Sequence, residues 1–221
     1  MSIQLQTVRF GSTCHYEDDD CDLIGSGSFG NTYKASITKR GNYVGPDVVA
    51  VRFFKIRDKR FVENPENYAK LQERFEMMLK LKHDHLVDYH QVTIIPTYFN
   101  VMVKFIMDYF SDNLQSKLKR TEDSGTVLNV GDAIGHALDL ADGLAFLHEN
   151  GITHGDLKPA NVLIDGFNAQ RETLRISDWD SLVTLQRCSV SSLNYKYFRN
   201  SARCVSPELA AALSPRNTLT T

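Results

Sequence analysis

The residues best suited to chemistry in this chain of 221 residues lie on one short segment, residues 154–161, which reads HGDLKPAN. Asp156 could accept the proton of a hydroxyl group, and the amide oxygen of Asn161 could bind a magnesium ion. Lys158 lies two residues beyond Asp156 and could contact a phosphate group. Together these three side chains are suited to the transfer of a phosphoryl group onto a hydroxyl.

A glycine-rich stretch near the N-terminus is the second candidate for binding phosphate. Gly25, Gly27 and Gly30 match the pattern G-x-G-x-x-G, which on its own also occurs in plain turns. A dinucleotide-binding fold would continue as a helix after the third glycine, whereas residues 32–35 (TYKA) continue as a strand. This context favours a hairpin folded over phosphates.

The elements that must position these residues fall into a strand-rich half and a helical half. Residues 22–56, 87–92 and 99–107 have strand-like composition, and a polar break follows at 110–113. Apolar residues at three- and four-residue steps predict a helix over 66–82 and a second over 132–149. The inward-facing stripe of the second helix is predicted to be Ile134, Leu138, Ala141, Leu144 and Leu147. Short strands are expected at 162–164 and 174–176, so the fold class is α+β with two lobes.

Composition excludes several other classes of protein. The formal net charge of −2 argues against a dedicated nucleic-acid binder, which is usually basic. The chain contains no run of about 18 apolar residues, which is the length needed to span a membrane. Its N-terminus does not read as a secretory signal. The four cysteines form no Cys-x-x-Cys pair, which indicates reduced thiols in a cytoplasmic or nuclear protein. His83, His85 and His90 lack an evident fourth ligand for a metal ion.

The segment 154–161, followed by the strand-like VLI at 162–164, resembles the catalytic loop of eukaryotic-type protein kinases. The lysine at position 158 resembles the serine/threonine branch of that family more than the tyrosine branch. The resemblance extends from about Leu23 to Glu208. It implies a protein substrate, with ATP and Mg²⁺ as cofactors, and the roles of base for Asp156, of γ-phosphate contact for Lys158 and of metal ligand for Asn161.

Further roles follow from the same resemblance. Asp178 begins the sequence DWD where the family has Asp-Phe-Gly, and is therefore a candidate chelator of the main magnesium ion. The sequence MDYF at 107–110 resembles the gatekeeper and hinge, so that the backbone around Asp108 and Phe110 would read adenine. Gly25, Gly27 and Gly30 would cover the phosphates, and SPE at 206–208 resembles the end of the activation segment.

The resemblance also divides the chain into parts. We expect an N-terminal extension at 1–21, the β-rich N-lobe at 22–110 and a partial, helical C-lobe at 111–221. The family continues with further helices after the position of Glu208, and this chain ends soon after it. The expected architecture is therefore a two-lobed kinase fold whose C-lobe lacks its last helices.

Departures from the family concentrate around the phosphates. Arg52 stands where the third strand of the family has lysine; it keeps the charge but is longer, flatter and differently placed. We expect Arg52 to occupy the phosphate site, with Lys34 as a conceivable substitute. The family pairs this lysine with a glutamate of the next helix, where the present chain has Arg74 flanked by Glu73 and Glu76. A register slip that turns Glu73 inward toward Arg52 is the preferred alternative.

Two further departures lie near the catalytic loop. Gly155 replaces an arginine that in the family commonly receives the phosphate of the activation loop, so activation by loop phosphorylation is not expected. Asp180 replaces a glycine and would either bind metal or stiffen its loop. Two functions remain open. One is an ATP-dependent kinase acting on serine or threonine of a protein substrate, and the other is a pseudokinase that binds nucleotide weakly or not at all and regulates a protein partner.

Overall fold

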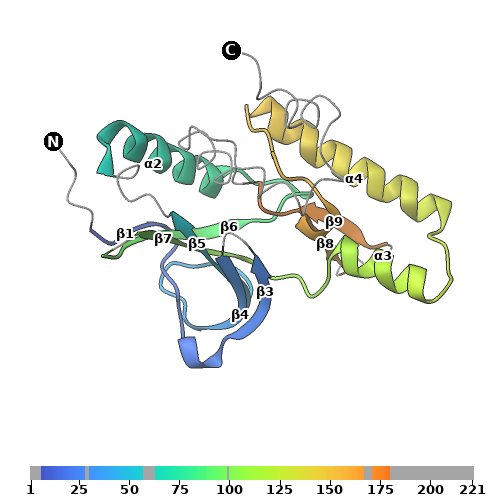
Figure 1. Ribbon diagram of the computed structural model, residues 1–221, viewed down its shortest axis with the longest axis horizontal. Coiled ribbons are helices and arrows are strands. Elements are labelled where there is room, and N and C mark those ends of the chain that lie inside the picture. Colours follow the sequence, from blue (N-terminus) through green and yellow to red (C-terminus); the bar gives the residue numbers. More distant parts are fainter. Residues whose placement is uncertain (1–5, 28–29, 57–62, 99, 167–170, 180–221) are drawn as a thin grey trace, which may run out of the picture.

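The computed structural model describes residues 6–27, 30–56, 63–98, 100–166 and 171–179. Within these residues a sheet-rich lobe and a helical lobe lie side by side (Figure 1). Asp180, the serine-containing segment after it and the SPE sequence at 206–208 lie outside the described residues.

The N-lobe is built on an antiparallel sheet, which comprises seven strands in the part of the chain that is described. Its strands are β1 (Val8–Gly11), β2 (His15–Tyr16), β3 (Asp22–Gly27), β4 (Gly30–Lys39), β5 (Val48–Ile56), β6 (Tyr89–Pro96) and β7 (Val101–Asp108). The strand order is β1-β6-β7-β5-β4-β2, and β3 pairs with β4. Residues 8–11 and 15–16, which lie within the expected N-terminal extension 1–21, thus form two strands of this sheet.

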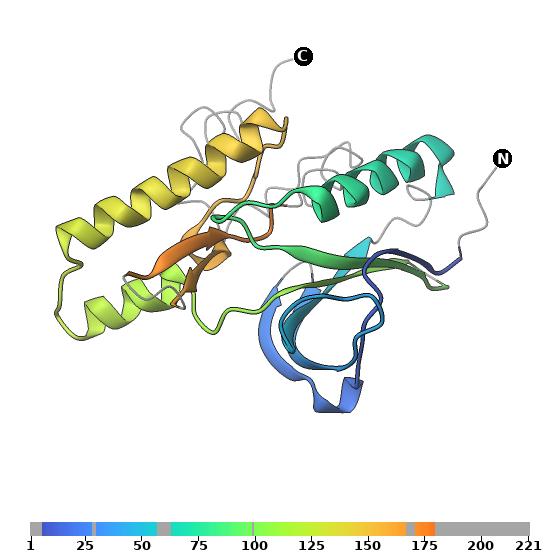
Figure 2. The same cartoon turned by 180° about the vertical axis from the view of Figure 1, so that it is seen from behind.

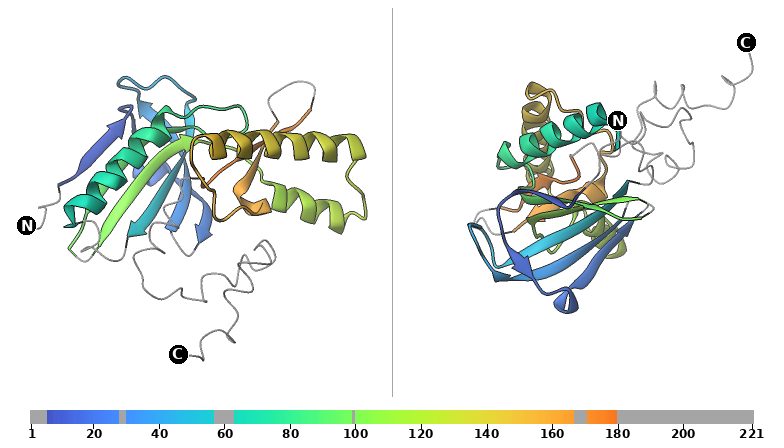
Figure 3. Two further views of the ribbon diagram at one scale, coloured as in Figure 1. Left: turned by 90° about the horizontal axis from the view of Figure 1, so that it is seen from above. Right: turned by 90° about the vertical axis from the view of Figure 1, so that its left-hand side faces the viewer.

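Helix α2 (Pro65–Lys80) packs across one face of the sheet (Figure 3). Its first turn is capped by Asn64, whose side-chain oxygen accepts hydrogen bonds from the backbone N–H groups of Glu66 (3.0 Å) and Asn67 (3.2 Å). The buried residues Leu71, Phe75 and Met78 recur at helical spacing and enter the core beneath the sheet. The predicted helix at 66–82 is confirmed, with its boundaries shifted by one to two residues.

The helical lobe contains α3 (Leu114–Asp123), α4 (Val130–Glu149) and a hairpin of β8 (Val162–Asp165) and β9 (Thr173–Ile176). A one-turn 3-10 helix, Pro159–Asn161, leads into β8, and another at Asp18–Asp20 precedes β3. Figure 2 shows the hairpin between the sheet and the two helices. The predicted strands at 162–164 and 174–176 are confirmed, and Asn113 of the predicted polar break caps α3 by accepting a hydrogen bond from the Ser116 N–H (2.9 Å).

The buried face of α4 matches the predicted stripe only in part: Leu147 is buried and Leu144 packs half-buried against the core, as expected. The inward residues are His136, Asp139, Gly143 and Leu147, whereas Ile134 is 57% exposed and Leu138 is 64% exposed. Gly143 explains the choice of face, because a Cβ there would lie 3.0 Å from the backbone oxygen of His85. Close approach of the helix backbone at Gly143, together with the burial of Leu147, sets the rotation of α4.

The two lobes share one hydrophobic core. Its buried members come from β5, α2, β6, β7, α4 and the end of β9. Backbone hydrogen bonds also cross the junction, from the Val87 N–H to the Ile176 oxygen (3.0 Å) and from the Ile176 N–H to the His85 oxygen (2.9 Å). Among the described residues no helix is long and apolar enough to cross a membrane.

Candidate active site

The imidazole of His154 holds the start of the segment 154–161 in place. The side chain is buried; its Nδ1 accepts a hydrogen bond from the Asp156 N–H (3.3 Å), and its Nε2 lies 2.9 Å from the backbone oxygen of Ser177. Because a carbonyl oxygen can only accept, Nε2 is the donor to Ser177, while Nδ1 is the acceptor from Asp156. Gly155, which lies between His154 and Asp156, has φ +76°, a conformation that favours glycine. This geometry ties Asp156 to the strand end at Ser177.

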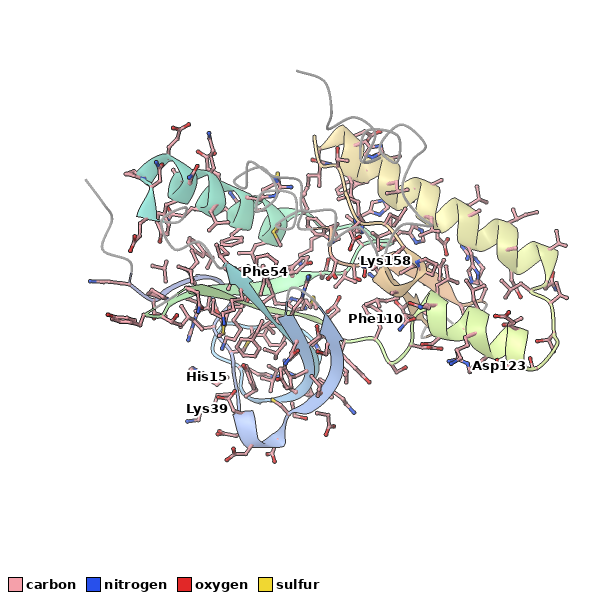
Figure 4. All side chains as sticks on the ribbon, in the orientation of Figure 1. His15, Lys39, Phe54, Phe110, Asp123 and Lys158 are labelled. Carbon is pink, nitrogen blue, oxygen red and sulfur yellow. The ribbon has the colours of Figure 1, made fainter. Side chains whose placement is uncertain are left out.

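The three residues predicted to carry the chemistry are brought together. The Lys158 ammonium lies 2.8 Å from Oδ2 of Asp156. The side-chain Nδ2 of Asn161 donates to the Asp156 backbone oxygen (2.9 Å) and lies 3.4 Å from Oδ2 of Asp156. Figure 4 labels Lys158 beside the β8–β9 hairpin and Phe110 at the connection toward α3. The Asp156 carboxylate is thus held in place by a cation and an amide.

Asn161 also connects this segment to the residues that follow β9. Its backbone oxygen accepts hydrogen bonds from the Ser177 N–H (2.8 Å) and the Ser177 hydroxyl (3.0 Å). Asp178 comes next and has a left-handed backbone, φ +59°, which is uncommon outside glycine. Trp179 is fully buried, and its indole N–H donates to the Val87 oxygen (3.2 Å). Sequence reasoning did not foresee Trp179 as an anchor, although a lone tryptophan beside the predicted metal ligand was a signal.

Arg52 forms an ion pair with Asp178, through Nη1 and Oδ1. Arg52 lies in the central strand β5, where it pairs with Thr32 of β4 and Phe105 of β7. The two side chains are 9% and 29% exposed. The pair therefore joins the sheet of one lobe to the strand end of the other, and it unites two predicted site residues.

The expectation that Glu73 turns inward toward Arg52 is wrong, because Glu73 is exposed. Glu76 is exposed as well, and Arg74 is half-buried. The buried face of α2 is set by Leu71 and Phe75. Glu73 lies two residues from each of them, which is a rotation of about 200° and places it on the far side of the helix. Apolar packing under the sheet therefore decides the register in which α2 faces Arg52.

The glycine-rich segment is a hairpin, as predicted, with no helix after the third glycine. Gly25 pairs with Thr32, Ser26 with Asn31, and Gly27 with Gly30. Gly30 has φ +150°, and a Cβ at this position would lie 1.6 Å from the Phe53 oxygen of β5. Glycine is required there because β4 and β5 approach too closely for any side chain.

The predicted hinge residues have partners within the chain. The carboxylate of Asp108 lies 2.8 Å from Nε2 of His90, and its N–H donates to the Asp88 oxygen (3.0 Å). The Phe110 ring lies 5.6 Å from the guanidinium carbon of Arg175. The Lys34 ammonium lies 5.4 Å from the Tyr109 ring, so the contact observed for Lys34 is at this connection. Sequence spacing carried no signal for these contacts.

The donors available for a metal ion are oxygens. An amide oxygen of Asn161 and a carboxylate of Asp178 are the types of ligand that magnesium prefers. Among the described residues no cluster of three or more His, Cys, Asp or Glu side chains is arranged for a metal. The donor types thus fit magnesium, while the Arg52 guanidinium already binds one oxygen of Asp178.

The sequence matches the protein kinase domain family over residues 19–218. The chain therefore belongs to the protein kinase family, as the resemblance of the segment 154–161 predicted. A two-lobed kinase fold accounts for the curled antiparallel sheet on one side of the site and the helices on the other.

Similar proteins include serine/threonine kinases of diverse eukaryotes. The chain is 30% identical over 146 residues to the MAP kinase kinase kinase SSK2 of Saccharomyces cerevisiae, covering 65% of this chain and 8% of that protein. It is 31% identical over 155 residues to the serine/threonine-protein kinase mos of Gallus gallus (64% and 41%). It is 29% identical over 182 residues to an inactive leucine-rich repeat receptor-like serine/threonine-protein kinase of Arabidopsis thaliana (79% and 25%). The chain thus spans less than half the length of these relatives.

Proposed function

We propose that this chain transfers the γ-phosphoryl group of ATP to a serine or threonine hydroxyl of a protein substrate. The observation that carries the proposal is the Asp156 carboxylate, held by the Lys158 ammonium at 2.8 Å and by the Asn161 amide. A carboxylate in this setting can orient the substrate hydroxyl and accept its proton.

The neighbouring side chains have separate tasks in this proposal. Lys158 balances the charge of Asp156 and offers an ammonium to the transferring phosphoryl group. Asn161 and Asp178 would hold magnesium, which when bound neutralises phosphate charge. Gly25, Gly27 and Gly30 lie on the hairpin that would cover the phosphates. His154 keeps the loop in register with Ser177.

The test is phosphoryl transfer by the purified chain, measured with γ-labelled ATP and a general protein substrate. We expect Asp156→Asn to reduce the rate by about 100- to 10,000-fold, because the amide cannot accept a proton. Asp142→Asn, an exposed carboxylate of α4, is the matched control and should retain the rate. A rate that is equal in both variants would exclude Asp156 as the base.

A second function, a pseudokinase that regulates a protein partner, is favoured by the ion pair between Arg52 and Asp178. The pair engages a carboxylate that an active enzyme would use for metal. Melting with and without ATP and Mg²⁺ separates the two functions, because a ligand of the native state raises the melting temperature. A shift without turnover supports the pseudokinase, and turnover that Asp156→Asn abolishes supports the enzyme.

A further inference from the structure

The ion pair between Arg52 and Asp178 engages a carboxylate that the proposed function assigns to metal binding. We propose that Arg52 competes with magnesium for the Asp178 carboxylate, so that a divalent cation binds only by displacing the guanidinium. Arg52 would then lower the affinity of this site for metal by occupying the Asp178 carboxylate. The inference deepens the proposed nucleotide site and takes Asn161 and Asp178 as its metal donors.

The guanidinium is well placed to resist displacement. Arg52 lies on β5, which is hydrogen-bonded to a neighbouring strand on both sides, and its side chain is 9% exposed. Charges attract more strongly in such a shielded environment than in water, because fewer water molecules screen them. A guanidinium is also weakly hydrated and directs its N–H groups in a fixed plane toward a carboxylate.

The backbone that carries the Asp178 carboxylate is also held in place. Asp178 has the left-handed backbone already described, between two anchored neighbours. Ser177 donates its N–H and hydroxyl to the Asn161 oxygen and accepts from His154. Trp179 is buried against Tyr89, with 5.1 Å between ring centroids. Because both flanking residues are fixed, the Asp178 backbone cannot shift to open the pair, and we expect metal binding to move Arg52.

The same arrangement has a consequence for nucleotide. A cation already present beside Asp178 can face the phosphates in the absence of metal, so nucleotide binding should depend only weakly on Mg²⁺. With the guanidinium removed, the carboxylate loses this neighbouring cation and should repel phosphate more strongly until a divalent cation binds. The affinity for metal and the dependence of nucleotide binding on metal should therefore rise together when Arg52 is replaced.

The first measurement needs no nucleotide. Mn²⁺, which accepts the same oxygen ligands, is titrated into the full chain and its free concentration is followed by electron paramagnetic resonance. We expect Arg52→Met to bind Mn²⁺ at least about tenfold more tightly than the natural chain. Arg52→Lys, whose shorter stem and point charge hold the carboxylate less well, should bind at least about threefold more tightly. Arg40→Met breaks an exposed pair with Asp47 and should leave Mn²⁺ affinity unchanged.

The second measurement compares the affinity for a fluorescent ATP analogue in EDTA and in Mg²⁺. The ratio of the two dissociation constants should be below about 3 for the natural chain and above about 10 for Arg52→Met. Fluorescence of Trp179 confirms that each variant is folded, and Arg52→Lys decides the outcome if Arg52→Met does not fold.

The outcomes separate this inference from the proposed function. If folded Arg52 variants bind Mn²⁺ no more tightly than the natural chain, the competition is refuted. If no variant binds nucleotide under either condition, the proposed function fails, while the Mn²⁺ comparison still decides whether Arg52 blocks the metal.

Discussion

Asp139 lies on the buried face of α4 and accepts hydrogen bonds from the Arg171 guanidinium (2.5 and 2.9 Å) and from the Leu174 N–H (3.0 Å). Burial by itself would raise the pKa of this carboxyl, but the hydrogen bonds from Arg171 and Leu174 and the charge of His85 outweigh that effect. The pKa of Asp139 therefore lies below its ordinary value. At the scale of single residues, this carboxylate fastens α4 to the β8–β9 hairpin.

We expect Asp139→Asn to lower the free energy of unfolding by about 2 kcal/mol at pH 7, because it removes charge-assisted hydrogen bonds. A carboxyl with a depressed pKa contributes stability above its ordinary value of about 3.9, and the contribution is lost as the pH falls through the folded-state pKa. Urea unfolding of the natural chain and the variant at several pH values should therefore show a difference that shrinks below about pH 4.

Asp142→Asn is the matched control for Asp139, since the side chain lies on the same helix but is 65% exposed. Its effect at pH 7 should stay within about 0.5 kcal/mol, because exposed ion pairs contribute little to stability. Equal losses in the two variants, or a loss in Asp139→Asn that does not change with pH, would contradict the role given to the buried carboxylate.

At the scale of elements, the β3–β4 hairpin owes its shape to contact with β5. At Gly30 the neighbouring backbone leaves no room for a side chain, since the position of its Cβ is occupied by the Phe53 oxygen. Gly25, on the opposite strand, has only the Thr32 Cβ nearby, at 3.9 Å. Within the glycine pattern, the packing of the fold therefore requires glycine at Gly30 but leaves space for a side chain at Gly25.

We expect Gly30→Ala to lower the free energy of unfolding by more than about 2 kcal/mol, because a Cβ would force β4 and β5 apart. Gly25→Ala should change it by less than about 1 kcal/mol, since ordinary space surrounds that position. Urea unfolding of the two variants provides the comparison. Similar losses at both positions would show that the approach of β4 to β5 does not limit the hairpin.

At the scale of the whole molecule, the shared core links the unfolding of the two lobes. Trp179 is the only tryptophan of the chain and contacts the core formed by α2, the sheet and the end of β9. Its fluorescence therefore reports on the junction, whereas far-ultraviolet circular dichroism reports on helices and strands throughout the chain.

We expect urea unfolding curves followed by Trp179 fluorescence and by circular dichroism to coincide, because the described lobes share buried residues and unfold as one cooperative unit. A fluorescence transition at a lower urea concentration than the circular dichroism transition would show that the junction opens before the lobes unfold. Arg40→Met removes an exposed ion pair away from the junction, so the fluorescence and circular dichroism curves of this variant should still coincide.

The sequence by itself determined the features that depend on neighbours along the chain. Asp156, Lys158 and Asn161 are separated by a few residues on one loop, so their spacing alone brought them together. The hairpin at Gly27 and Gly30 and the helical periodicity of 66–82 were local for the same reason. Residue types at short range carry this information because backbone geometry restricts what nearby side chains can contact.

Tertiary structure alone decided which distant residues meet. Arg52 and Asp178 are 126 positions apart, and no spacing rule links them. The rotation of α2 excluded Glu73, the close approach at Gly143 turned that side of α4 inward, and residues 8–11 and 15–16 became strands by pairing with β6 and β4. Each outcome depends on how preformed elements pack, since one helical step turns a side chain by about 100° and only the packed core selects the step.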